Sequence, residues 1–283
     1  MTGKEPLEIF ERLRGIDKGY SGEPFLESIL EGTTPVPFFG DYQNASVVTL
    51  SLNPSSDEFL SQERRLVHLR DLKLSENFYK DGNRLDETLL ARRIFDGLEN
   101  YFEQETWYKD WFEKPEKALN IGLNASYRSE IVQKLGGLKA CHTDLSPWAT
   151  KSWRRLNSLT KNSMIHENGN FLSWFLSLDH FKQIVILGSG SEKGLRKSSR
   201  RTDLYFPFEL HEVHSERVED FSDGTFSSGI LRIGFGGNSV EKQYFYNSFP
   251  PTVPYRSDNE QTLRYELFGN YIKRIVSSGV GGV

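Results

Sequence analysis

The fold is decided by the stretch Val47-Val48-Thr49-Leu50-Ser51-Leu52-Asn53-Pro54-Ser55. Its first six residues are mostly apolar or β-branched, which is typical of a strand buried inside a sheet. Proline does not continue a central strand, so the chain turns at Pro54 and leaves the Asn53 side chain at the strand tip. We therefore predict a strand over 46–52 that presents Asn53. The same Asn-Pro pair is also a common turn signal with no further role.

Further strands and helices follow along the chain. We expect strands at 140–145, 183–187, 206–213, 230–235 and 243–246, and helices at 6–14, 23–31, 86–102, 107–119, 153–161, 171–178 and 259–276. Alternating strands and helices predict an α/β fold of three α/β/α layers with a mostly parallel central sheet. Ligands of such sheets bind beyond the carboxyl ends of the strands. The polar residues that follow predicted strands, and so converge there, are Asn53, Asp144, Ser189 and Asn247.

Composition narrows the class of protein. The 283 residues include 35 Lys+Arg and 39 Asp+Glu, so the net charge is 35 − 39 = −4. This balance argues against a chain coated in basic charge but leaves room for a local basic groove. The single cysteine, Cys141, excludes a disulfide framework, a four-cysteine zinc site and a four-cysteine iron–sulfur cluster. No apolar run reaches the roughly 18–20 residues of a membrane span, and no signal peptide is recognised. We expect one cytoplasmic domain over 1–283, with a helical insertion at 58–138 and a flexible tail at 277–283.

Two further segments, besides the Asn-Pro turn, contain candidate ligand-binding residues. In Cys141-His142-Thr143-Asp144-Leu145-Ser146-Pro147-Trp148, Asp144 stands at a predicted strand end. An ionised carboxylate only accepts hydrogen bonds, and cytosine offers an amino donor at N4. The alternative is an aspartate that ends the strand or caps the next helix. In Gly188-Ser189-Gly190, a turn that opens a helix suits a phosphate, although such junctions are common.

Together these segments resemble motifs of the uracil-DNA glycosylase superfamily, in order over about residues 35–255. The nearest group is bacterial, carries the pattern seen here as Val36–Asp41 and Leu52–Ser55, and resembles anti-phage glycosylases that excise glucosylated hydroxymethylcytosine. Two positions depart from the superfamily. Asp144 stands where an asparagine reads the base, and Asn247 stands where many members have a histidine.

The resemblance implies roles for individual residues. Asn53 positions the hydrolytic water, Asp144 binds the flipped base, and Asn247 donates a hydrogen bond in place of the histidine. Phe249 fills the gap that the base leaves. His211 and His214 are possible substitutes for the missing histidine, and the ordinary alternative for both is a packed or surface residue.

The resemblance also bears on the substrate. Members of the uracil-specific branch have a tyrosine at the place of Ser55, so the small Ser55 leaves room beside C5 of the base. The alternative is a serine that caps the next helix. Phe59 follows one turn later and is a candidate to stack on the base, or else a core residue.

Basic residues after the strands predict a phosphate-binding rim. The predicted DNA contacts are Lys151, Arg154, Ser189, Lys193 and Phe249, and neighbouring cations are Arg64, Arg65, Arg70, Arg155, Arg196, Lys197, Arg200 and Arg201. A solvated charged face is the ordinary alternative.

We therefore expect a monofunctional DNA glycosylase, monomeric, that acts on a 5-substituted cytosine in phage DNA and leaves an abasic site. No lysine stands at the water position, so we expect no Schiff base. No metal, cofactor or membrane partner is expected. The alternatives are a repair glycosylase for uracil or hydroxymethyluracil, and a catalytically silent DNA-binding module.

Overall fold

A computed structural model describes residues 25–30, 35–54, 95–105, 107–150, 152–199, 208–218, 221, 224–251 and 257–279. The predicted helix at 6–14, the residues 58–94 of the predicted insertion and the tail from 280 lie outside these ranges. The helix predicted at 23–31 is described over 25–30, where the chain forms a 3-10 helix at Leu26–Ser28 instead.

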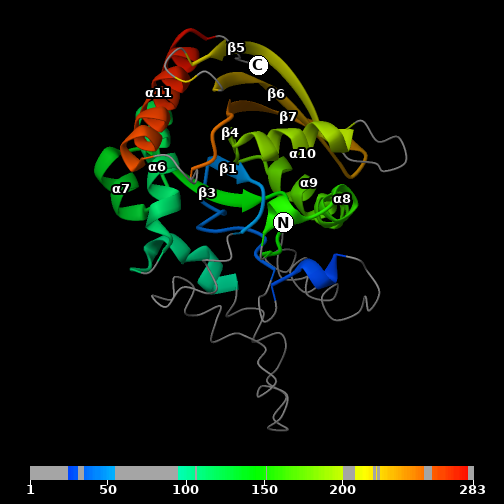
Figure 1. The fold of residues 1–283 in the computed structure, drawn as a ribbon. Helices are drawn as coiled ribbons and strands as arrows, with labels where there is room; N and C mark the ends of the chain where they lie inside the picture. Colours follow the sequence, from blue (N-terminus) through cyan, green and yellow to red (C-terminus); the bar gives the residue numbers. More distant parts are fainter. Residues whose placement is uncertain are drawn as a thin grey trace.

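The described chain forms an α/β structure around one mixed, mostly parallel sheet (Figure 1). Its strands are β1 (Val47–Ser51), β2 (Ala125–Ser126), β3 (Leu138–Asp144), β4 (Gln183–Leu187), β5 (Phe208–Arg217), β6 (Thr225–Phe235) and β7 (Asn238–Asn247). Their order across the sheet is β2-β3-β1-β4-β7-β6-β5. The neighbours from β2 to β7 are parallel, whereas β6 is antiparallel to both β7 and β5.

The register of β1 fixes what lies at the carboxyl edge. Ser51 pairs with Asp144 of β3, and Leu50 pairs with Ile186 of β4. Every residue of β1 is buried, because β1 is flanked by strands on both sides and covered on both faces. The tips of β1, β3 and β4 therefore meet at one edge of the sheet.

Helices cover both faces of the sheet (Figure 1). One group holds α6 (Lys109–Leu123), α7 (Ser129–Leu135) and α11 (Asp258–Ser277), and the other holds α8 (Ser158–Glu167), α9 (Gly169–Ser177) and α10 (Ser189–Ser199). Three short 3-10 helices occur within the described ranges, at Leu26–Ser28, Tyr101–Glu103 and Trp153–Arg155. The expected α/β class with helices on both faces of the sheet is confirmed.

Close packing of α6 on α11 depends on two glycines. A Cβ atom on Gly122 would lie 2.7 Å from Cβ of Ile272, and one on Gly269 would lie 2.8 Å from Cβ of Ile121. A side-chain hydrogen bond also caps the start of α11. The Ser257 hydroxyl accepts from the Glu260 amide at 3.2 Å at the start of α11.

Several predicted elements are confirmed, and some boundaries were wrong. The strand at 183–187 is found as predicted, and the predicted strand at 46–52 is β1. The three C-terminal strands are longer than predicted and antiparallel, since the two-glycine turn at Gly236 (φ 59°) and Gly237 (φ 82°) joins β6 to β7 as a hairpin. The helix predicted over 153–161 is instead a 3-10 turn followed by α8, which Asn157 caps.

The described part of the predicted insertion is integral to the fold. Residues 125–126 add β2 to the sheet edge, and α6 packs on α11. Tyr101, Phe102 and Phe112 belong to the main hydrophobic core. Residues 95–138 are thus part of the domain body, not an appendage to it.

Among the described helices, none has the length and apolar character required to cross a membrane.

Candidate functional site

Polar side chains gather at the carboxyl ends of β1 and β3. Ser51 and Asp144 are the last residues of these strands and are paired in register. Asn53 follows β1 by two residues, and its amide Nδ2 donates to the Pro54 carbonyl at 2.9 Å. As expected from a parallel sheet, Asn53 and Asp144 line the same pocket.

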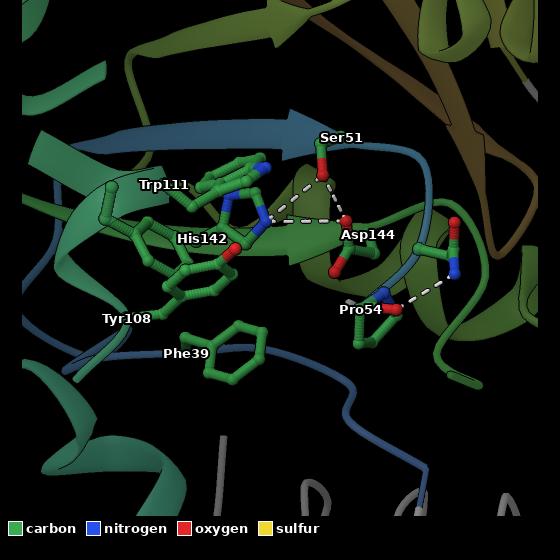
Figure 2. Close-up of a pocket in the computed structure, with 9 residues that line it drawn as sticks. Phe39, Ser51, Pro54, Tyr108, Trp111, His142 and Asp144 are labelled. Atoms are coloured by element: carbon green, nitrogen blue, oxygen red, sulfur yellow. Dashed lines mark hydrogen bonds and ion pairs between the residues drawn. The ribbon is translucent and has the colours of Figure 1, made fainter. Parts of the chain in front are cut away.

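That narrow pocket is a cavity of about 40 Å³ (Figure 2). It is lined by Phe39, Ser51, Asn53, Pro54, Tyr108, Trp111, Phe112, His142 and Asp144. The aromatic residues of this lining come from the 35–40 segment and from the start of α6, so the described part of the predicted insertion builds one wall of the pocket.

Asp144 forms a polar end of this pocket. Only 2% of the residue is exposed. The Ser51 hydroxyl donates to its Oδ1 in a very short hydrogen bond, and Nε2 of His142 lies 3.4 Å from the same oxygen. In the described part of the chain, Oδ2 has no hydrogen-bond partner. Asp144 therefore offers one oxygen to the protein and one to a ligand.

His142 joins this carboxylate to a buried chain of hydroxyl groups. Its Nδ1 lies 2.8 Å from Oγ1 of Thr49, and Oγ1 lies 2.8 Å from the Tyr127 hydroxyl. Burial raises the pKa of Tyr127 well above its ordinary value, so this hydroxyl stays protonated. No role for His142 was predicted from the sequence. Strand alternation was the available signal, because Thr49 and Ser51 on β1, and His142 and Asp144 on β3, are spaced by two and share a face.

Aromatic rings enclose His142. The ring centroids of Trp111 and Phe112 lie 5.0 and 5.1 Å from that of His142, both near the edge-to-face geometry, and Phe39 lies at 5.9 Å (Figure 2). These rings exclude water from the imidazole and strengthen its electrostatic contacts. The pocket is thus a small aromatic slot with a carboxylate in its lining.

A wide cleft adjoins the slot. Its cavity volume is about 560 Å³, within the range of small-molecule sites. Ser51, Asn53 and Trp111 line both spaces, so the cleft and the slot share a wall. The other side of the cleft is Gly188 and the first turn of α10, at residues 189–191, together with Pro250 and Pro251.

Three cations lie on the cleft without an acidic partner. Arg154 and Lys193, both predicted DNA contacts, line the cleft and are exposed, and Lys161 lies beside them. Among the described residues none of the three forms an ion pair, and Lys161 donates only to the Arg154 carbonyl at 3.4 Å. Ser189 also lines the cleft, but its amide already donates to the Ser248 carbonyl at 3.0 Å, so only its hydroxyl is available to a phosphate.

The tip of β7 differs from the expectation. Asn247 is fully buried, its Oδ1 accepts from the Phe249 amide at 3.0 Å, and it lines neither the slot nor the cleft. Its side chain closes a turn, so the structure gives no support for a donor role toward the base. Its Nδ2 has no partner within the described residues.

Phe249 is not placed as a wedge. The ring is 5% exposed and packs against Phe221, and the Arg264 guanidinium lies 3.8 Å from its centroid. The ring is held in the core under a guanidinium, so the structure gives no support for the predicted wedge role.

His211 and His214 lie far from the slot and the cleft. Both lie on β5, the far edge of the sheet, and β5 is four strand positions from β1, or about 19 Å. His211 is exposed beside Glu209, and Nδ1 of His214 contacts the Tyr271 hydroxyl at 3.1 Å.

The remaining predicted residues lie outside the described part of the chain. These are Ser55, Phe59, Arg64, Arg65, Arg70, Lys151, Arg200 and Arg201, and the side chains of Arg196 and Lys197. Within the described residues, no group of three or more histidine, cysteine or acidic side chains is arranged to hold a metal ion.

Comparison with known proteins adds no relative: no protein-family model matches the chain, and no curated protein matches it.

Proposed function

We propose that this protein is a monofunctional DNA glycosylase that hydrolyses the N-glycosidic bond of a flipped, 5-substituted cytosine and leaves an abasic site. The observation that carries the proposal is the pairing of a slot with a cleft. Asn53 and Asp144 line an aromatic slot, and this slot shares Ser51, Asn53 and Trp111 with a cleft bordered by unpaired cations. In this proposal the amino edge of the base enters the slot, whose cavity of about 40 Å³ does not hold a whole ring, and the rest of the nucleotide lies in the cleft.

Phosphate binding is supported by the charge on the cleft. Arg154, Lys161 and Lys193 have no acidic partner in the described residues, so their charge is available to a polyanion. The net charge of −4 keeps general attraction to DNA weak. Capture of a flipped base, which costs a few kcal/mol of unstacking, then supplies the selectivity.

Base recognition in this proposal depends on Asp144. Its Oδ2 accepts the N4 amino group of a cytosine, whereas the O4 carbonyl of uracil offers no hydrogen there. Rings such as Trp111 and Phe39 supply apolar surface for the base. The adjoining cleft has room for a substituent on C5, such as a glucosylated hydroxymethyl group.

Hydrolysis in this proposal depends on Asn53. Its Nδ2 donates to the Pro54 carbonyl, which leaves Oδ1 to accept from a water beside the sugar. The C1′–N bond breaks with its electron pair leaving on the nucleobase, the sugar becomes cationic, the water oxygen bonds to C1′, and one proton of that water passes to the departing nucleobase. Because the sugar is already cationic, the water needs little activation by a general base. The Asp144 carboxylate lies in the same pocket and favours that cation electrostatically. Among the described residues, no lysine lines the slot, so we propose direct attack by water without a Schiff base.

The biological setting follows from the substrate. We propose that the protein acts as a monomer in the cytoplasm, where it attacks phage DNA that carries modified cytosine.

The test uses duplexes that differ in one base. Wild-type protein is incubated with glucosyl-hydroxymethylcytosine, hydroxymethyluracil or uracil at the same position, and alkali-labile sites are counted. We expect abasic sites with the modified cytosine and far fewer with the other two. Asn53→Ala should lower the excision rate by about 100-fold or more while DNA binding is retained. Efficient uracil excision with an inert modified cytosine would replace this proposal with a repair glycosylase, and DNA binding without release of any base would indicate a silent module.

A further inference from the structure

The hydrogen bonds around His142 have one consistent direction. The Tyr127 hydroxyl is buried and protonated, and within the described residues its one hydrogen-bond contact is Oγ1 of Thr49 at 2.8 Å. Tyr127 therefore donates to Thr49. Thr49 in turn has two acceptors in reach, Nδ1 of His142 at 2.8 Å and the Cys141 carbonyl at 3.3 Å. Nε2 of His142 lies 3.4 Å from the Asp144 carboxylate, which only accepts, so the ring hydrogen belongs on Nε2 and Thr49 donates to Nδ1.

An acceptor at Nδ1 fixes the rest of the ring. In a neutral imidazole only one nitrogen carries a hydrogen, so an accepting Nδ1 places the hydrogen on Nε2. Nε2 faces Ser51 Oγ and Asp144 Oδ1, each at 3.4 Å. Ser51 donates to the same Oδ1. Two donors thus converge on Oδ1 of Asp144, which leaves Oδ2 as the free acceptor.

We propose that His142 is a positioning residue for base recognition: with its hydrogen fixed on Nε2 by the Tyr127–Thr49 chain, it holds Oδ1 of Asp144 and turns Oδ2 into the slot as an acceptor for the exocyclic amino group of a pyrimidine. This inference rests on the proposed function, because it takes the ligand of the slot to be a base. It adds that selectivity for an aminopyrimidine over uracil depends on a buried chain that never contacts the base.

The tautomer is testable without any activity. In ¹⁵N NMR spectra of the wild-type chain, His142 should give the neutral ring pattern with a protonated Nε2 and an unprotonated Nδ1. The other tautomer, with the hydrogen on Nδ1, would direct a lone pair at Asp144 and would overturn the inference.

Selectivity is testable with free bases. Cytosine and uracil are titrated into the protein, and binding is followed by the indole resonance of Trp111. The wild-type chain should bind cytosine at least about 10-fold more tightly than uracil. His142→Phe keeps a flat ring in the aromatic enclosure but removes the donor, so this preference should fall by about 10-fold. His142→Gln restores an N–H donor and should recover part of the preference, and Thr49→Val and Tyr127→Phe should give smaller losses. His211→Gln on the exposed edge strand is the control and should change nothing.

The outcomes separate this inference from the proposed function. An unchanged cytosine preference in folded His142→Phe overturns the inference even if the wild-type protein excises bases. A wild-type chain that binds both bases equally also overturns it. Selective cytosine binding that is lost in His142→Phe supports it, and if no base is then excised from DNA, the proposed glycosylase function fails alone.

Discussion

The tips of β1 and β3 and the tip of β7 look alike in the sequence but differ in the structure. Asn53 and Asn247 both follow or end a parallel strand, and a proline follows each within three residues. At β1 and β3 the tip opens into the slot and the cleft. At β7 the tip is closed by α11, because Arg264 lies over Phe249 and the Tyr265 hydroxyl donates to the Phe249 carbonyl at 3.0 Å.

The difference shows what makes a strand tip a site. Position at the carboxyl edge of a parallel sheet is shared by both tips, so it does not decide the matter. The covering element decides it. The start of α6 leaves a slot above Asp144, whereas α11 packs directly on the β7 tip. Variants at the open tip should therefore change chemistry, and variants at the closed tip should change stability.

Phe249→Ala is expected to have the largest effect, at the closed tip. Removing a buried ring should lower the free energy of unfolding by about 3–5 kcal/mol, since it leaves a cavity beneath Arg264. Urea denaturation measures this change. Excision by the molecules that remain folded should stay near wild type. Phe235→Ala, at a ring that is 37% exposed, is the control and should cost far less. Lost excision at unchanged stability would instead place Phe249 at the DNA.

Asp144→Ala, at the open tip, should change the rate of base excision more than the stability of the fold. The rate of base excision should fall by about 100-fold, because the acceptor for the base and the charge near the sugar are both removed. Single-turnover assays measure the rate, and Asp179→Ala at an exposed position is the control. Near-normal excision by folded Asp144→Ala would show that the slot is not the base-binding site.

A paired change on the cleft tests whether the open tip faces DNA. Arg154→Gln with Lys193→Gln should weaken duplex binding several-fold and reduce the slope of log affinity against log salt by about 2. Fluorescence anisotropy at several salt concentrations gives this slope. Lys134→Gln, on α7 in the other helical group, is the matched control. Equal slopes in all variants would place the DNA on another surface.

Tyr265→Phe should have the smallest effect on the free energy of unfolding, and it tests how that free energy depends on pH. Burial raises the pKa of Tyr265 well above its ordinary value of about 10, so the folded state favours the neutral hydroxyl. The stabilisation is therefore complete below pH 10 and is lost as the pH rises above it. Tyr265→Phe should cost about 1 kcal/mol at neutral pH, because the hydrogen bond to Phe249 is lost, and should reduce the alkaline loss of stability. Denaturation at pH 8 and above pH 10 tests this, and an unchanged pH dependence would contradict the assignment.

The sequence predicted the parallel core of the fold well. The strands at 46–52 and 183–187 are apolar runs ended by Pro54 and Gly188, so local patterns define them. The antiparallel arrangement of β5–β7 was missed, because apolar runs do not reveal strand direction. The two-residue β2 was missed too, since it is held only by its pairing with β3.

The site was predicted only in part, because local patterns predict where strands end but not which elements pack over their ends. Asn53 and Asp144 follow strands directly, so sheet geometry brings them together. Asn247 and Phe249 follow a strand as well, but tertiary packing by Arg264 and Tyr265 buries them, and no local pattern predicts that packing. Strand alternation places His142 on the same face as Asp144, but its role depends on contacts with Thr49 and Tyr127 that no local pattern predicts.

The most direct test of the account is mass spectrometry of the free bases released from DNA that contains glucosyl-hydroxymethylcytosine, compared with DNA that contains uracil. The account predicts that the wild-type protein releases the intact modified cytosine as a free base, without a sugar–phosphate adduct, and that Asn53→Ala releases about 100-fold less. Release of uracil alone, or of no base by a protein that is folded and binds the DNA, would contradict it.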